Sequence, residues 1–330
     1  MCHHELAQRI RGHGGTDAGV EVCLREGYPK SAEQMIVSAS RRTDIPAFYA
    51  EWFVRRVRAG YCEVPNPMNP RQVARVSLLP EEVDAVVFWT RSPRALLPRL
   101  AELDVRGLRY YFQFTICGYG PPLEVRNPPT ATALDTFKRL ASRLGPDRVI
   151  WRYDPLVFSE VTTVDFHLGN FESMAMALKG YTHRCVVSIW DNYRKLSSRL
   201  EDLTSQGVHL RQPTQEEIAS LIPRLAQVCA AHGMEVVSCA EPYNLRPYGV
   251  CPGKCIDDEF IGRVFGLEVS HIKHSAQRKA CGCVVSKDIG MYDSCLFGCT
   301  YCYATSKFER SRLNYRLHNP DAPSLLGWYE

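Results

Sequence analysis

Six short runs of apolar, β-branched or aromatic residues recur along the chain and predict buried strands. Each run is mostly apolar on both faces and is bounded by polar residues or proline, as expected of parallel strands that are covered on both sides. The runs are Met35–Ser38, Ala85–Trp89, Tyr110–Thr115, Val149–Tyr153, Cys185–Trp190 and Glu235–Cys239.

Helical patterns lie between these runs. The clearest spans Thr214–Gly233, where Thr214 and Glu217 form a capping box ahead of apolar positions at helical spacing. Strands that alternate with helices imply right-handed βαβ units and a parallel sheet. No glycine-rich turn follows the first strand, so the dinucleotide-binding fingerprint is absent. We therefore expect an α/β fold, a partial or full TIM-like (β/α) barrel.

The chain divides into three predicted regions. Residues 1–34 are polar and lack periodicity, which predicts a disordered tail, and residues 35–240 hold the barrel pattern. After residue 240 several prolines and glycines interrupt any long element, and the cysteines cluster. Residues 241–330 are therefore predicted to form a cysteine-rich metal-binding cap.

Composition narrows the classes of protein. An apolar fraction of 45% and a charged fraction of 23% over 330 residues are typical of a globular chain. A net charge of +4 gives little support to a nucleic-acid partner, so none is expected. No apolar run is long enough to cross a membrane, and the N-terminus has no signal-peptide core, so we expect a cytoplasmic protein without a membrane partner.

Eight of the fourteen cysteines fall between Cys239 and Cys302. Because a reducing cytoplasm disfavours disulfides, clustered cysteines indicate metal binding. The sharpest motif is Cys295-x3-Cys299-x2-Cys302, whose three thiolates can ligate three irons of a [4Fe–4S] cluster and leave the fourth iron open. A zinc site completed by a residue elsewhere, or a loop without metal, is the alternative.

This motif resembles the cluster-binding motif of the radical S-adenosylmethionine (SAM) superfamily. A longer stretch, about residues 35–315, resembles the DUF1848 family, which is grouped with radical SAM-like proteins; it includes VSASRRTDIPA, FWTRSP and the segment from Cys283 to Tyr292. The resemblance implies that SAM chelates the open iron and is cleaved reductively to methionine and a 5′-deoxyadenosyl radical. It also implies an external electron donor such as flavodoxin or ferredoxin, and leaves the substrate unspecified.

The chain departs from the superfamily pattern in two ways. The motif follows the sixth strand rather than the first, and no GGE-type stretch follows the second strand. A loop from either end of the chain can still cover the carboxyl-terminal mouth of a barrel, where such sites are built. The competing hypothesis is a non-catalytic iron–sulfur or zinc-binding protein with an electron-transfer or structural role.

A second cysteine group lies between residues 239 and 283. Any four of its five thiols could ligate an auxiliary iron–sulfur cluster or a zinc ion, and separate buried thiols are the remaining alternative. The preferred ligands are Cys239, Cys255, Cys281 and Cys283, with Cys251 able to replace Cys255.

Polar residues follow the predicted strands, where they would face the mouth of a barrel. Arginines there could hold a carboxylate, and carboxylates could hold ribose hydroxyls or an amino group. Alternatively, Asp44 only caps a helix and Arg152 pairs with Asp154 or Glu241. The predicted cofactor-binding residues are Arg41, Asp44, Thr90, Gln113, Arg152, Asp154 and Glu241.

Overall fold

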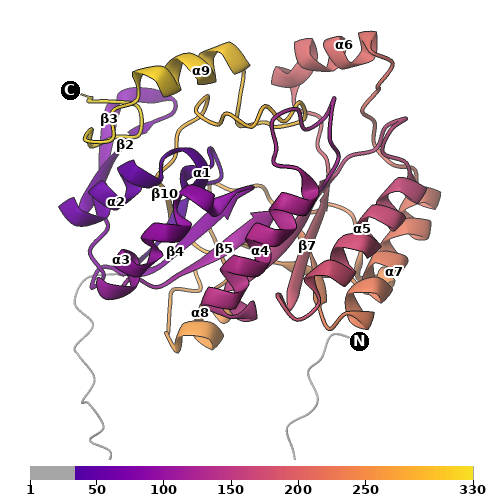
Figure 1. The fold of residues 1–330 in the computed structure, drawn as a ribbon, viewed down its shortest axis with the longest axis horizontal. Helices are drawn as coiled ribbons and strands as arrows, with labels where there is room; N and C mark the ends of the chain where they lie inside the picture. The colour runs from indigo at the N-terminus through magenta and orange to yellow at the C-terminus, as the bar shows by residue number, and fades with distance from the viewer. Residues whose placement is uncertain (1–33, 330) are drawn as a thin grey trace, which may run out of the picture. The chain divides into compact units, whose positions relative to one another are not determined.

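Eight parallel strands form one sheet in the computed structural model of the chain, which describes residues 34–329 (Figure 1). The predicted tail, residues 1–34, lies outside this range apart from Gln34. The order across the sheet is β10 (Lys287–Asp288), β1 (Met35–Ala39), β4 (Val83–Thr90), β5 (Tyr110–Thr115), β6 (Val149–Leu156), β7 (Arg184–Ile189), β8 (Glu235–Cys239) and β9 (Cys251–Gly253).

The six inner strands confirm the six predicted runs, whereas both edge strands were missed. β9 has three residues and includes Pro252 and Gly253, and β10 has two, so neither carries a readable strand pattern. An antiparallel hairpin of β2 (Tyr61–Asn66) and β3 (Asn69–Ser77) was also unexpected. Most of β3 is exposed to solvent, which explains why its sequence lacks apolar alternation.

Helices follow the predicted patterns with local differences. The predicted capping box of Thr214 and Glu217 is present at the start of α7, and the stretch before Gly60 is split at Tyr49 into α1 and α2. No helix among residues 34–329 combines the length and apolar composition needed to cross a bilayer. The helices are α1 (Ile45–Phe48), α2 (Ala50–Ala59), α3 (Leu100–Val105), α4 (Thr130–Leu144), α5 (Val164–Leu178), α6 (Ser197–Ser205), α7 (Gln215–Ala231), α8 (Asp258–Phe265) and α9 (Phe308–Leu317).

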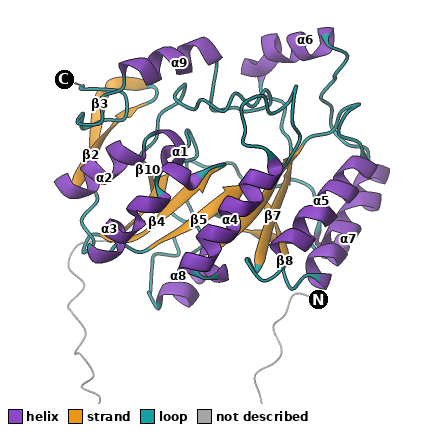
Figure 2. Ribbon diagram, viewed as in Figure 1, coloured by secondary structure: helices purple, strands orange, loops and turns teal. Residues whose placement is uncertain are grey.

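The two faces of the sheet bury different cores. On β4, Val86 and Phe88 belong to the larger core, which the helices between consecutive strands cover (Figure 2). Ala85 and Val87 point to the other face and belong to a smaller core that includes Phe260 of α8. Because side chains alternate along a strand, strands buried on both faces need apolar residues at nearly every position, which is the pattern of the sequence.

The parallel α/β prediction is confirmed, but the described strands do not pair into a closed barrel. β9 and β10 lie at opposite edges of the sheet, and no strand pairing joins them among residues 34–329. Segments beside the two edges nevertheless meet, because the Val284 amide donates a hydrogen bond of 3.2 Å to the Ile256 carbonyl. Ile256 follows β9 and Val284 precedes β10, so contacts outside the strands bridge this seam.

A buried histidine on α5 predicts acid sensitivity. His167 accepts a hydrogen bond from Tyr153 and donates one to the Val157 carbonyl, and burial lowers its pKa from 6.5 to about 4. The unfolded chain then binds a proton at a higher pH than the folded chain does, so stability falls as pH drops from about 6.5 towards 4.

We expect the His167 contribution to cost about 2 kcal/mol between pH 7.5 and pH 5. The variant His167→Gln, which keeps one donor and one acceptor, should lose that pH dependence. Denaturant unfolding of both proteins at the two pH values measures it. An equal loss of stability in both proteins would contradict the assignment.

Candidate functional site

A cavity of about 800 Å³ lies at the carboxyl ends of the parallel strands. Residues at or just beyond the ends of β1, β4, β5, β6, β7 and β8 line it, as the sequence predicted for the mouth of such a sheet. Thiols of both cysteine groups also line this cavity: Cys239, Cys255, Cys281, Cys283, Cys295, Cys299 and Cys302. The two groups therefore share one solvent space.

The Cys295–Cys302 loop is fixed by hydrogen bonds to its backbone. The Tyr49 hydroxyl donates to the Ser294 carbonyl at 2.7 Å, and Trp190 Nε1 donates to the Tyr301 carbonyl at 3.2 Å. Within the loop Gly298 has φ +69°, a left-handed conformation that favours glycine. The loop is therefore anchored from the junction of α1 and α2 and from the residue after β7, and its three thiols line the cavity.

Arg199 of α6 anchors the same loop from the other side. Its guanidinium donates to the carbonyls of Cys299 at 3.2 Å, Cys302 at 2.8 Å and Thr305 at 2.6 Å. The side chain is buried and lies over the ring of Phe308. One cation thus donates to three carbonyls of this irregular loop, of which that of Cys299 also accepts from the Cys302 amide at 3.2 Å.

A buried ionic group backs Cys299. The Arg91 guanidinium pairs with Glu124 and donates to the Tyr301 hydroxyl, which itself donates to Glu124. Among the charges near Cys299, the positive charge of Arg91 favours the thiolate and the negative charge of Glu124 opposes it. Arg91 is therefore placed to offset charge that thiolates bring to the cavity.

Burial disfavours the thiolate forms of Cys295 and Cys299. It raises the pKa of Cys299 to about 12 and also raises the pKa of Cys295. A metal centre favours the thiolates and displaces these protons. The side chains of Cys295, Cys299 and Cys302 act electrostatically on one another, so the three thiols lie near one another on the cavity wall.

The second group forms a row of sulfur contacts. Cys239 Sγ lies 2.8 Å from Cys255 Sγ, Cys255 and Cys283 are hydrogen-bonding partners, and so are Cys283 and Cys281. The hydrogen bond from Cys283 lowers the pKa of Cys281 to about 7. Cys251, the alternative ligand, lies in β9 and is not among the cavity-lining residues.

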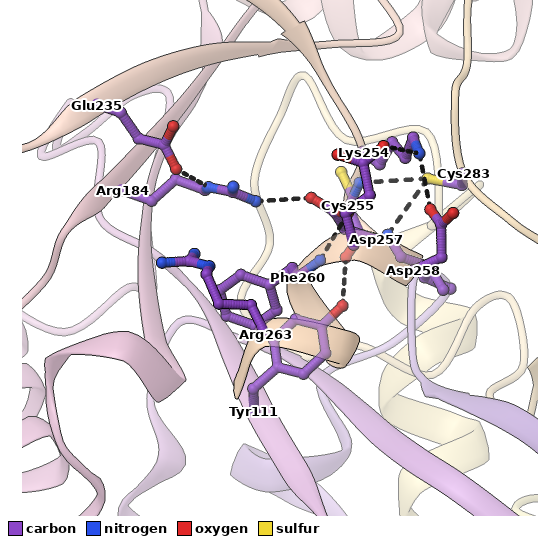
Figure 3. Close-up of polar contacts among 12 residues, drawn as sticks. Tyr111, Arg184, Glu235, Lys254, Cys255, Asp257, Asp258, Phe260, Arg263 and Cys283 are labelled. Carbon is purple, nitrogen blue, oxygen red and sulfur yellow. Dashed lines mark hydrogen bonds and ion pairs between the residues drawn. The ribbon is translucent and has the colours of Figure 1, made fainter. Parts of the chain in front are cut away.

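The surroundings of Cys255 are polar and well satisfied. Arg152 Nη1 lies 2.9 Å from Cys255 Sγ, and both Tyr111 and Gln113 donate to the Cys255 carbonyl. Figure 3 shows Tyr111 reaching up to this backbone and Cys283 beside Cys255, above α8. In residues 34–329 no three His, Cys, Asp or Glu side chains are placed so that they could hold a single metal ion.

The structure brings five of the seven predicted cofactor-binding residues to the cavity wall: Arg41, Asp44, Thr90, Arg152 and Asp154. Asp44 caps α1 through the Ala47 amide and also accepts from Thr90 and the Arg91 amide. Burial raises the pKa of Asp44 to about 7. Arg152 pairs with Asp154. The structural roles that the sequence offered as alternatives, a helix cap for Asp44 and an ion pair for Arg152, are therefore both present, and both residues also line the cavity.

The other two predicted residues do not line the cavity. Gln113 is fully buried between Arg152 and the Cys255 carbonyl. Glu241 accepts from the backbone amides of Ile189 and Tyr243, which ties β7 to the chain after β8. Gln113 lies within β5 and Glu241 follows β8, and both side chains are occupied by protein contacts.

Sequence reasoning did not select Glu124 or Arg199. Glu124 lies in the irregular segment between β5 and α4, far from any strand end. Arg199 lies on α6, a helix with only two fully buried residues and a weak apolar pattern. The sequence around each residue has no motif that marks it, because each contacts the Cys295–Cys302 loop only in the folded chain.

Comparisons with known proteins bear on the family only. No curated protein matches the chain. Among solved structures, a candidate alpha-L-fucosidase from Bacteroides thetaiotaomicron matches 90% of this chain and 92% of its own chain, with 9% sequence identity. The TM-score of 0.27 is too low to indicate a shared fold or function. A family model described as "Domain of unknown function (DUF1848)" matches residues 36–304, which include the six inner strands and both cysteine groups. The chain therefore belongs to the DUF1848 family.

Proposed function

We propose that this chain is a radical SAM-type enzyme whose [4Fe–4S] cluster is held by Cys295, Cys299 and Cys302. The observation that supports it most is the placement of three neighbouring thiols from one anchored loop on the wall of a cavity of about 800 Å³. Three thiolates leave one iron of a cubane without a protein ligand. The cavity provides the space for an exchangeable ligand at that iron.

The donor set fits such a cluster. Thiolates are the usual ligands of iron–sulfur centres, and hydrogen bonds and nearby charges tune them. When bound, the cluster and SAM would supply one-electron cleavage of a carbon–sulfur bond, giving methionine and, after hydrogen abstraction from the substrate, 5′-deoxyadenosine.

The protein's own residues would orient the ligand and exclude water. Arg41 lines the cavity with its guanidinium over the ring of Trp89, where it can hold a carboxylate. Asp154, which pairs with Arg152, lies on the same wall and would accept from an ammonium or a ribose hydroxyl there. Arg91 and Glu124 keep the charge behind Cys299 balanced.

The finer description of the fold belongs to this proposal. We regard the sheet as a TIM-like barrel left open between β9 and β10, with residues 241–330 providing the metal-binding cap over its mouth. Reductive cleavage requires an external one-electron donor, for which flavodoxin or ferredoxin is proposed, and a cytoplasmic setting suits an oxygen-sensitive cluster.

Anaerobic reconstitution tests the proposal on the whole chain. We expect iron and sulfide to bind, the reduced protein to give an electron paramagnetic resonance signal, and added SAM to change that signal. Methionine and 5′-deoxyadenosine should then accumulate with a chemical reductant. A signal indifferent to SAM, with no cleavage products, would instead indicate the non-catalytic alternative.

A further inference from the structure

The second cysteine group joins the two edges of the sheet. Cys239 ends β8 and Cys255 follows β9 at one edge, whereas Cys281 and Cys283 precede β10 at the opposite edge. The amides of Cys255 and Ile256 donate to Cys283 Sγ at 3.3 and 3.4 Å. We propose that Cys239, Cys255, Cys281 and Cys283 hold an iron–sulfur cluster of their own, which fastens the open seam of the sheet and faces the cavity.

The surroundings of these sulfurs suit bound thiolates. Backbone N–H groups and a guanidinium that point at sulfur stabilise its negative charge. Cys283 has two such N–H donors, and Cys255 has Arg152 at 2.9 Å. Gln113 and Asp154 hold Arg152 in place, which makes it a positioning residue for this centre.

The layout of the sulfurs favours a cluster over a single ion. A tetrahedral zinc site needs four sulfurs around one point, with Zn–S distances of about 2.3 Å. Here the contacts run in sequence from Cys239 through Cys255 and Cys283 to Cys281. Among residues 34–329 no three His, Cys, Asp or Glu side chains are placed to hold one ion, whereas four thiols that span a seam can bind the separate irons of a larger centre.

This proposal uses none of the ligands of the Cys295–Cys302 loop, so it can be tested independently of the proposed function. All four thiols line the cavity, which places the second centre within reach of whatever the cavity binds.

Metal analysis of anaerobically purified variants tests the proposal. Cys281→Ala/Cys283→Ala should lose about half of the iron and sulfide of the unaltered protein, given two clusters of equal size. The matched control is Cys185→Ala/Cys229→Ala, which removes two contacting thiols of the larger core, one on β7 and one on α7, and should keep all the iron. Equal iron in both double variants, or one equivalent of zinc lost with Cys281 and Cys283, would overturn the proposal.

Native mass spectrometry of the unaltered chain avoids any folding defect of a variant. It should show the mass of two clusters; one cluster, or a zinc adduct, contradicts the proposal. If the paramagnetic signal of the unaltered protein is unchanged by SAM while the Cys281→Ala/Cys283→Ala variant still holds half of the iron, that combination would contradict the proposed function and support the second centre.

Hydrogen exchange tests the role at the seam. The amides of Val284 and Ile289, which bond to Ile256 and to Ser38 of β1, should exchange at least tenfold faster when the second centre is removed. Amides of β5 and β6 should exchange as before. Unchanged exchange at Val284 would show that the centre does not fasten the edges.

Discussion

Replacing Cys299 with alanine abolishes reductive cleavage of SAM if the Cys295–Cys302 loop holds the open cluster. Cys299 is the middle ligand of the motif, and two remaining thiolates cannot hold three irons of a cubane. The expected loss is at least a thousandfold in 5′-deoxyadenosine formed, together with the SAM-sensitive paramagnetic signal. Product analysis and spectroscopy on the same anaerobic sample measure both.

The matched control for this variant is Cys62→Ala. Cys62 is also buried, lies on β2 and is not among the cavity-lining residues, so its replacement costs packing without touching the site. We expect Cys62→Ala to keep cleavage within about twofold. Cleavage retained in Cys299→Ala would refute the assignment of the loop.

The inner sheet could be read from the sequence because its signal is local. Each strand such as Tyr110–Thr115 is buried on both faces, so its own residues are nearly all apolar. The edge strands β9 and β10 depend on pairing with β8 and β1 rather than on their own residues. Two or three residues contain no periodicity, so only the folded chain reveals them.

The residues of the candidate site were likewise predictable only where the sequence itself marks them. Motif spacing picked out Cys295, Cys299 and Cys302, because ligands on one short loop must be close in space. Strand ends picked out Arg41 and Asp154, since the carboxyl ends of parallel strands meet at one edge.

What the sequence could not show is which polar side chains are already satisfied by protein. Gln113 was predicted from its strand, yet its amide bridges Arg152 and the Cys255 carbonyl. Arg199 was missed because its partners are three carbonyls about a hundred residues later, and a carbonyl leaves no mark in the sequence.

Arg199→Ala tests whether that arginine holds the cluster loop in its binding conformation. The change removes the Arg199 donor from the carbonyls of Cys302 and Thr305, at about 1–3 kcal/mol for each that stays buried and unpaired, whereas the Cys299 carbonyl keeps the Cys302 amide. If only about 1.4 kcal/mol of this cost falls on the metal-binding arrangement, affinity of the loop for its cluster drops tenfold. We therefore expect iron to be lost from this loop to a chelator at least ten times faster, while iron at the second centre is unaffected.

The control is Arg194→Ala, an exposed arginine just before α6 that makes none of these bonds. Arg199→Lys keeps the charge but not the planar fork, and should fall between the two. Equal iron retention in all three variants would mean that the loop keeps its shape without α6, and that Arg199 contributes only to packing.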